Sequence, residues 1–119
     1  MKKDNQILID SKAFAIRIIK LYVYLQEKHI FTLSKQVLRS GTSIGANVRE
    51  SVNAQSRLDF INKLNIALKE ANETEYWLEL LHESDFLDDN QFDSIYNDCG
   101  KIAATLTKII KTTKSGMLE

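Results

Sequence analysis

The sequence predicts an all-α protein in which four helices form an antiparallel, up-down-up-down bundle. The chain has 119 residues, no proline and only four glycines, so it is poor in the residues that end strands and form tight hairpin turns. Four segments repeat apolar residues at steps of three and four, which is the period of an amphipathic helix. Short links between long helices force neighbours to run antiparallel. Residues 1–119 are therefore expected to form a single four-helix domain.

The first helix is expected over residues 10–29, with Asp10 or Ser11 as its cap. One apolar stripe should face the core and comprises Phe14, Ile18, Leu21, Tyr22 and Leu25. A second apolar stripe comprises Ala15, Ile16, Ile19 and Val23. The helix is thus apolar over more than half of its circumference, and one small bundle would cover only part of this apolar surface. The second stripe therefore predicts a subunit interface.

The second helix is expected over residues 33–54, with Thr32 or Ser34 as its cap. Gly41 and Gly45 fall inside it, and each costs about 1 kcal/mol of helix stability relative to alanine. Something must compensate for this cost. The close approach of another backbone is the reason we expect.

The third helix is expected over residues 57–83, because Ser56 and Asp59 resemble a capping box ahead of a regular apolar period. The fourth is expected over residues 89–112, capped by one of the aspartates at its start. Beyond residue 112 the sequence has no apolar pattern, so we expect the helix to fray there.

Charge is balanced over the whole chain but unevenly distributed along it. Sixteen Lys and Arg offset sixteen Asp and Glu, so the chain has no overall attraction to nucleic acid. Residues 1–49 hold nine basic and three acidic residues, residues 50–98 three and twelve, and residues 99–119 four and one. Acidic surface is therefore expected on the third helix and basic surface on the others. The basic surface, which is either a phosphate contact or an ordinary solvated face, comprises Lys12, Arg17, Lys20, Lys35, Arg49, Lys101, Lys108, Lys111 and Lys114.

Polar residues also recur on one face of the second helix. This polar stripe comprises Gln36, Arg39, Ser43, Asn47 and Glu50. The amides of Gln36 and Asn47 can donate and accept hydrogen bonds at once, and Arg39 could pair with an acid, so the stripe is either a buried interhelical network or a surface that touches a partner or a phosphate backbone. Catalysis is not expected, since the stripe holds no histidine, cysteine or paired carboxylates beside a nucleophile.

No metal, cofactor or catalytic site is expected. Glu79 and His82 have the Glu-x-x-His spacing that supplies half of a di-iron site, but the only other histidine, His29, has no acid three residues before it. Cys99 lies within an apolar stripe and is expected to be a small buried hydrophobe.

Tyr76 and Trp77 lie among glutamates, which would repel a phosphate backbone, so we expect them to pack on a neighbouring helix or a second subunit. A lone cysteine fits a reducing cytoplasm. No apolar run approaches the roughly 20 residues that span a bilayer, and no membrane association is expected.

Three motifs in the middle of the chain carry a family resemblance. They are Phe31-x-Leu33-x-x-Gln36-x-x-Arg39, Ser43-Ile44-x-x-Asn47-Val48-x-Glu50 and Asp59-Phe60-x-x-Lys63-Leu64-x-x-Ala67-Leu68-x-Glu70. In these motifs the chain resembles the bacterial four-helix-bundle family named for 23S rRNA intervening sequences. The resemblance implies a left-handed bundle, a ring-shaped homopentamer and no enzyme activity. A related branch, the accessory variability determinant of diversity-generating retroelements, is similar in fold and binds nucleic acid through a strongly basic surface.

Together, these observations predict a cytoplasmic, non-enzymatic homo-oligomer, a pentamer by resemblance, that acts as an RNA-associated or ribosome-associated accessory scaffold. The alternative is a protein–protein adaptor ring that binds no nucleic acid. Basic helices on the outer surface would favour the first function, and an acidic third helix on the outer surface would favour the second.

Overall fold

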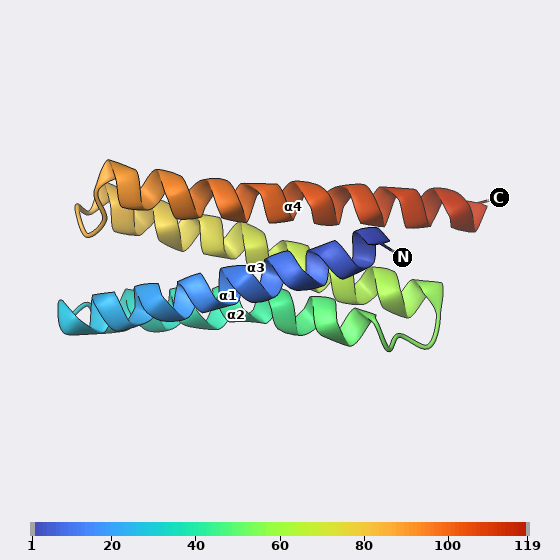
Figure 1. Cartoon of the computed structure of the whole chain (residues 1–119), viewed down its shortest axis with the longest axis horizontal. Coiled ribbons are helices and arrows are strands. Elements are labelled where there is room, and N and C mark those ends of the chain that lie inside the picture. The colour runs from blue at the N-terminus through green and yellow to red at the C-terminus, as the bar shows by residue number, and fades with distance from the viewer. Residues whose placement is uncertain (1, 119) are drawn as a thin grey trace.

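The computed structural model describes the backbone of residues 2–118 and the side chains of residues 6–116. Four helices fill the described chain: α1 (Lys2–Glu27), α2 (Phe31–Ser51), α3 (Arg57–Glu83) and α4 (Asp89–Leu118). Consecutive helices run in opposite directions along a bundle that measures 51 × 22 × 21 Å (Figure 1). The predicted all-α bundle is confirmed.

The helices are arranged as the corners of a square, in the order of the chain. α2 packs closely on both α1 and α3, and α4 packs on α3, whereas α1 and α4 meet over a shorter stretch. Within residues 2–118, the diagonal pairs α1 with α3 and α2 with α4 do not approach each other closely. The outer faces of α1 and α3 therefore point in opposite directions.

The core consists of the inward stripes of all four helices. Each helix contributes fully buried side chains at helical spacing, among them Ile18, Ile44, Leu78 and Leu106. A hydrogen bond of 2.9 Å between the hydroxyl groups of Ser40 and Thr74 crosses this core. Both residues are fully buried, so the bond satisfies polar groups that would otherwise be costly.

The first helix begins eight residues earlier than predicted. Ile7 is buried and continues the core stripe upstream of Phe14, so packing extends the helix beyond Asp10. Asp10 accepts a hydrogen bond from Gln6 Nε2 at 2.9 Å and does not cap the helix. Ser11 is buried, and its hydroxyl donates to the carbonyl of Leu8.

The predicted cap of α2 is also wrong. The helix begins at Phe31 after Ile30, which has no capping side chain. Ser34 lies inside the helix and is buried, and its hydroxyl donates to the Phe31 carbonyl at 2.9 Å. The helix ends at Ser51, three residues short of the prediction, and that side chain donates to the Val48 carbonyl at 2.6 Å.

The other two helices start as their polar residues predict. Ser56 Oγ accepts a hydrogen bond from the Asp59 N–H at 3.0 Å, and α3 runs over Arg57–Glu83. Asp88 caps α4, because its carboxylate accepts from the Gln91 N–H and the Gln91 side chain accepts from the Asp88 N–H. The predicted fraying after residue 112 is wrong, since α4 continues to Leu118.

The two glycines of α2 mark the close approach of α1, as predicted. A Cβ atom at Gly41 would lie 2.7 Å from Ile18 Cγ1, which is too close for real carbon atoms. A Cβ atom at Gly45 would lie 3.2 Å from the Ser11 carbonyl oxygen. The tight α1–α2 contact therefore compensates for the intrinsic cost of glycine within a helix.

Candidate functional site

The polar stripe of α2 forms ion pairs with α3 at the bundle surface. Arg39 pairs with Glu70, at 3.2 Å between Nη1 and Oε2, and with Glu73. Trp77 Nε1 donates to the same Glu73 carboxylate at 3.3 Å. Near the other end of the helix, Glu50 pairs with Lys63 at 3.3 Å. Arg39 and Glu50 thus link α2 to α3.

Two other members of the stripe, Ser43 and Asn47, bond within their own helix. Ser43 Oγ donates to the Arg39 carbonyl at 2.6 Å, and Asn47 Nδ2 donates to the Ser43 carbonyl at 2.8 Å. Gln36 is half-buried. The Arg39 side chain is 48% exposed and that of Glu50 57%, so the interhelical part of the stripe is a surface network and not a buried one.

The buried network, Ser40 with Thr74, was not predicted. A sequence signal for it exists, because Ser40 lies three residues after Val37 and Thr74 three residues after Ala71, both on core stripes. Two hydroxyl groups at core positions of adjacent helices are an indication that they bond to each other.

The structure divides the candidate basic residues into three groups. Arg17 is half-buried, pairs with Asp98 at 2.5 Å and donates to Ser94 Oγ at 2.9 Å, so its charge is neutralised by α4. Lys20 and Lys35 are exposed in the halves of α1 and α2 nearest the α3–α4 loop. The others are exposed at mid-length or toward the opposite end of the bundle and comprise Lys12, Arg49, Lys101, Lys108, Lys111 and Lys114.

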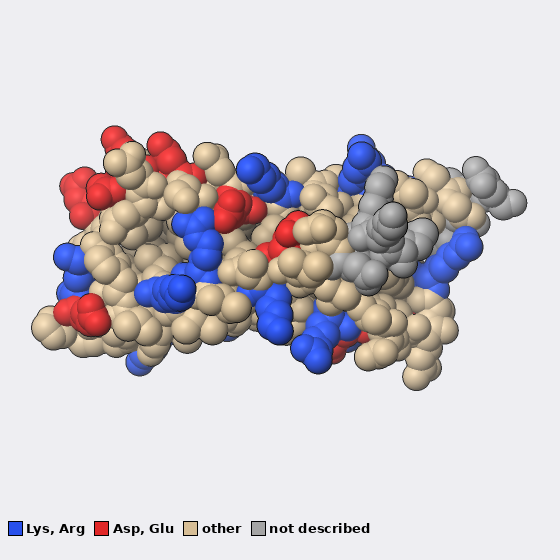
Figure 2. All heavy atoms as spheres, viewed as in Figure 1, with Lys and Arg blue, Asp and Glu red and all other residues tan. Residues whose placement is uncertain are grey.

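The outer face of α3 is not the acidic surface that the sequence predicted. Most of its acids are half-buried on the flanks of the helix, where Glu70 and Glu73 pair with Arg39 and Glu79 accepts from Tyr96 at 2.8 Å. The exposed residues along α3 are instead mainly amide and apolar: Leu58, Asn62, Asn65, Ile66, Lys69, Asn72 and Tyr76. Exposed acids crowd the end where α3 turns into α4 (Figure 2), and comprise Glu83, Asp85, Asp88, Asp89 and Asp93.

The second apolar stripe of α1 lies on the surface. Ile16, Ile19 and Val23 are each about half exposed, Ala15 is half-buried, and Ile9 extends the stripe at 61% exposure. On α3, Tyr76 is 54% exposed, whereas Trp77 packs against the core. Tyr76 is therefore available to a partner, and Trp77 contributes mainly to the fold.

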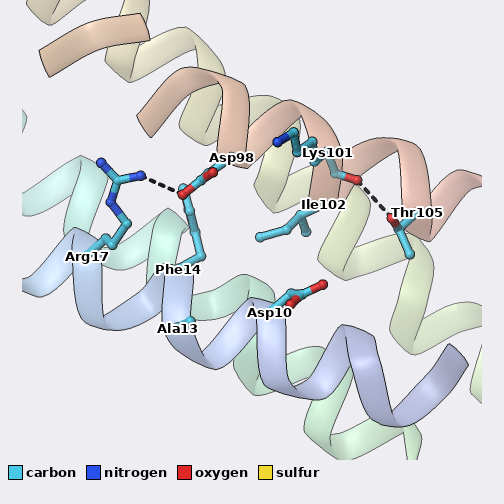
Figure 3. A pocket seen from close by; sticks show the side chains of 8 residues that line it. All are labelled: Asp10, Ala13, Phe14, Arg17, Asp98, Lys101, Ile102 and Thr105. Carbon is cyan, nitrogen blue, oxygen red and sulfur yellow. Dashed lines mark hydrogen bonds and ion pairs between the residues drawn. The ribbon is translucent and has the colours of Figure 1, made fainter. Parts of the chain in front are cut away.

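Several grooves of the described structure are lined by α1, and two of them hold candidate basic residues at mid-length. The groove between α1 and α4 has a volume of about 280 Å³, and Phe14 and Ile102 point into it from the two helices while Arg17 crosses to Asp98 at one end (Figure 3). The groove between α1 and α2 is larger, about 620 Å³, and has Lys12 and Arg49 among its lining residues. Neither groove joins a nucleophile to a base.

Three groups with shifted pKa values lie at the α3–α4 contact. The hydrogen bond to Glu79 and then burial raise the pKa of Tyr96 to about 12. Burial, followed by the charges of Glu75 and Asp98, raises the pKa of the Cys99 thiol to about 12. Burial, with a contribution from Glu79, raises the pKa of Glu75 above its usual range. At neutral pH the thiol and the phenol stay protonated, so neither supplies a nucleophile or a base.

His82 has structural contacts. Its Nε2 lies 2.8 Å from Asp89 Oδ1, and its ring stacks on Phe92 with 4.2 Å between centroids. Among the described residues, no three His, Cys, Asp or Glu side chains gather in an arrangement that could hold a metal ion. No described helix is long and apolar enough to cross a membrane.

Comparisons with known proteins agree with this architecture. The family model described as 23S rRNA-intervening sequence protein matches residues 3–108. A crystal structure from Bacteroides thetaiotaomicron, described as a protein of unknown function from the S23 ribosomal protein family, is 58% identical. The match covers 92% of this chain and 98% of that one, with a TM-score of 0.89. No curated protein matches the chain.

Proposed function

The chain belongs to the 23S rRNA-intervening sequence protein family, and from that premise we propose that it is a ring-forming, non-enzymatic accessory protein that associates with structured RNA. The observation that carries the proposal is a pair of exposed faces on opposite sides of the bundle that both carry large apolar side chains. One is the second stripe of α1, and the other is the outer face of α3.

Two different faces that point in opposite directions favour head-to-tail assembly. A two-fold dimer uses one self-complementary face, whereas two distinct faces join successive copies into a closed ring or an open filament. Ile16 and Ile19 on α1 would meet Ile66 and Tyr76 on the α3 of the next copy. The asparagines along α3 would supply hydrogen bonds at the rim of this contact.

Association with RNA is supported by lysines and arginines outside these two faces. A ring strengthens weak phosphate contacts, because the other copies bind the same RNA intramolecularly once one copy has bound it. A formal net charge of zero does not prevent this, because the opposing acids crowd the end where α3 meets α4.

Replacing Ile19 with aspartate is expected to lower the assembled mass to that of smaller species while helix content is retained. A charge on the half-exposed stripe would be desolvated in the interface but tolerated in the monomer. Light scattering measures the mass, and circular dichroism measures the helix content. Phe86→Asp is the matched control, because it introduces the same group at an exposed apolar residue in the α3–α4 loop. Equal masses for wild type and the Ile19 variant would contradict the proposed interface.

The wild-type protein is expected to bind a structured ribosomal RNA fragment with a steep salt dependence. Fluorescence anisotropy across a salt series should give a negative log–log slope that counts the phosphates neutralised. Absence of binding even at low salt would contradict the RNA function. The adaptor function would then be favoured, with the exposed acids at the α3–α4 loop as the surface for a basic partner protein.

A further inference from the structure

Charge is segregated along the length of the bundle. We call the end where α2 joins α3, which also holds the end of α4, the basic end, and the end where α3 joins α4 the acidic end. Figure 2 shows acidic side chains crowded where α3 turns into α4, and Lys and Arg side chains spread along the whole length of this face. The segregation cannot be read from the order of residues alone, because the antiparallel fold places residues that are distant in the chain at the same end of the bundle.

Three helices, α2, α3 and α4, contribute cations to the basic end, and α1 adds Lys12 at mid-length, where Ser11 lies beside Gly45. The six are exposed and comprise Lys12, Arg49, Arg57, Lys108, Lys111 and Lys114. Lys12 and Arg49 line the same groove between α1 and α2. Arg57 Nη1 lies 3.6 Å from the position of a Cβ atom at Gly116, so the start of α3 touches the end of α4. Lys12 and Arg49 thus share one groove, and Arg57 lies beside the end of α4 that carries Lys111 and Lys114.

Among the side chains of residues 6–116, no acid forms an ion pair with these cations. Unlike Arg17, Arg39 and Lys63, none of the six forms an ion pair with a carboxylate of the described side chains. Of the described acids nearest to these cations, Glu50 pairs with Lys63, Asp59 accepts from the Gln55 N–H, and Asp10 accepts from Gln6 Nε2. The sequence from Cys99 to Leu118 contains no acid at all.

We propose that the basic end is the surface that holds the phosphate backbone of RNA. This inference rests on the proposed function and states where on the molecule the RNA binds. The cations are spread over the end of a bundle about 22 Å wide. A nucleic acid helix repeats its phosphate charges over such a distance, so it can contact more of these cations than one acidic peptide segment can. In a ring whose copies run parallel, all basic ends lie on one rim, so RNA binds to one rim of the ring and not to its sides.

The test compares two double variants, each of which reverses the charge of two lysines, at opposite ends of the bundle. Lys108→Glu with Lys111→Glu is expected to weaken binding of the ribosomal RNA fragment tenfold or more and to reduce the log–log salt slope by about 2. Lys20→Glu with Lys35→Glu makes the same change nearer the acids and is expected to weaken binding less than threefold. Circular dichroism and light scattering establish that both variants keep their helix content and mass.

Each outcome separates this inference from the function on which it rests. If the wild-type protein binds RNA and both double variants weaken binding equally, the basic end is not the site, although the RNA function stands. If the wild-type protein does not bind, both proposals fail. A DNA duplex of the same length carries the same phosphate charges, so Lys108→Glu with Lys111→Glu should weaken its binding as well, and unchanged binding of the duplex would contradict a phosphate site at the basic end. Arg57→Gln on α3 provides a second probe of the basic end should the α4 variant lose helix content.

Discussion

Replacing Phe14 with alanine is expected to lower the free energy of unfolding by about 3–5 kcal/mol. The ring is 2% exposed and points from α1 into the space between α1 and α4. Removing it leaves a cavity at the least extensive of the four helix contacts. Loss of apolar burial and loss of packing contacts then act together. Urea unfolding followed by circular dichroism measures the change.

Ile16→Ala is the matched control for this experiment. Ile16 lies on the same helix but is 47% exposed, so its truncation is expected to cost less than about 1 kcal/mol in the monomer. Both variants should be compared at one low protein concentration, because assembly adds to apparent stability by mass action. Similar losses for the two variants would contradict the assignment of Phe14 to the core and Ile16 to the surface.

Replacing Gly41 with alanine is expected to destabilise the protein by about 1–3 kcal/mol. The added methyl group would lie 2.7 Å from Ile18 Cγ1 and 2.8 Å from Cγ2, and the fully buried, β-branched Ile18 cannot turn away easily. The gain in helix propensity, about 1 kcal/mol, offsets only part of this overlap. The midpoint of urea unfolding measures the effect.

Gly100→Ala should have the opposite sign. Nothing lies within 4 Å of a Cβ atom at Gly100, and the residue is in the middle of α4. The substitution is therefore expected to stabilise the protein by about 0.5–1 kcal/mol through helix propensity alone. A stabilising effect at both glycines would show that α1 and α2 do not approach as closely as described.

The fold could be predicted from the sequence wherever local chemistry and apolar period agree. Ser56 with Asp59 and Asp88 with Gln91 are caps whose side-chain oxygens accept hydrogen bonds from nearby backbone N–H groups, so their positions follow from the sequence. The first helix was misplaced because Asp10 can cap a helix, yet burial of Ile7 stabilises an earlier start. Ser34 looked like a cap for the same reason, although it bonds inside α2.

The surfaces could be predicted less well, because ion pairing depends on tertiary neighbours. A count of charges assigns acidic character to the third helix, but Glu70 and Glu73 are neutralised by an arginine more than 30 residues away. The separation of basic and acidic ends likewise requires the fold, since Lys12, Arg57 and Lys108 are distant in the chain. The second apolar stripe of α1 needed only helical periodicity, and its residues Ile16, Ile19 and Val23 are exposed.

The sequence of α2 has a consequence for how the molecule forms. This helix carries two glycines and several Ser, Thr and Asn side chains that bond back to its own carbonyls, so it is a weak helix in isolation. It packs extensively on both α1 and α3. The helical structure of α2 therefore depends on contacts with both α1 and α3. We expect the α1–α2 hairpin to be unstable in a nascent chain from which only these two helices have emerged. Folding must wait for α3, which makes the bundle an all-or-none unit.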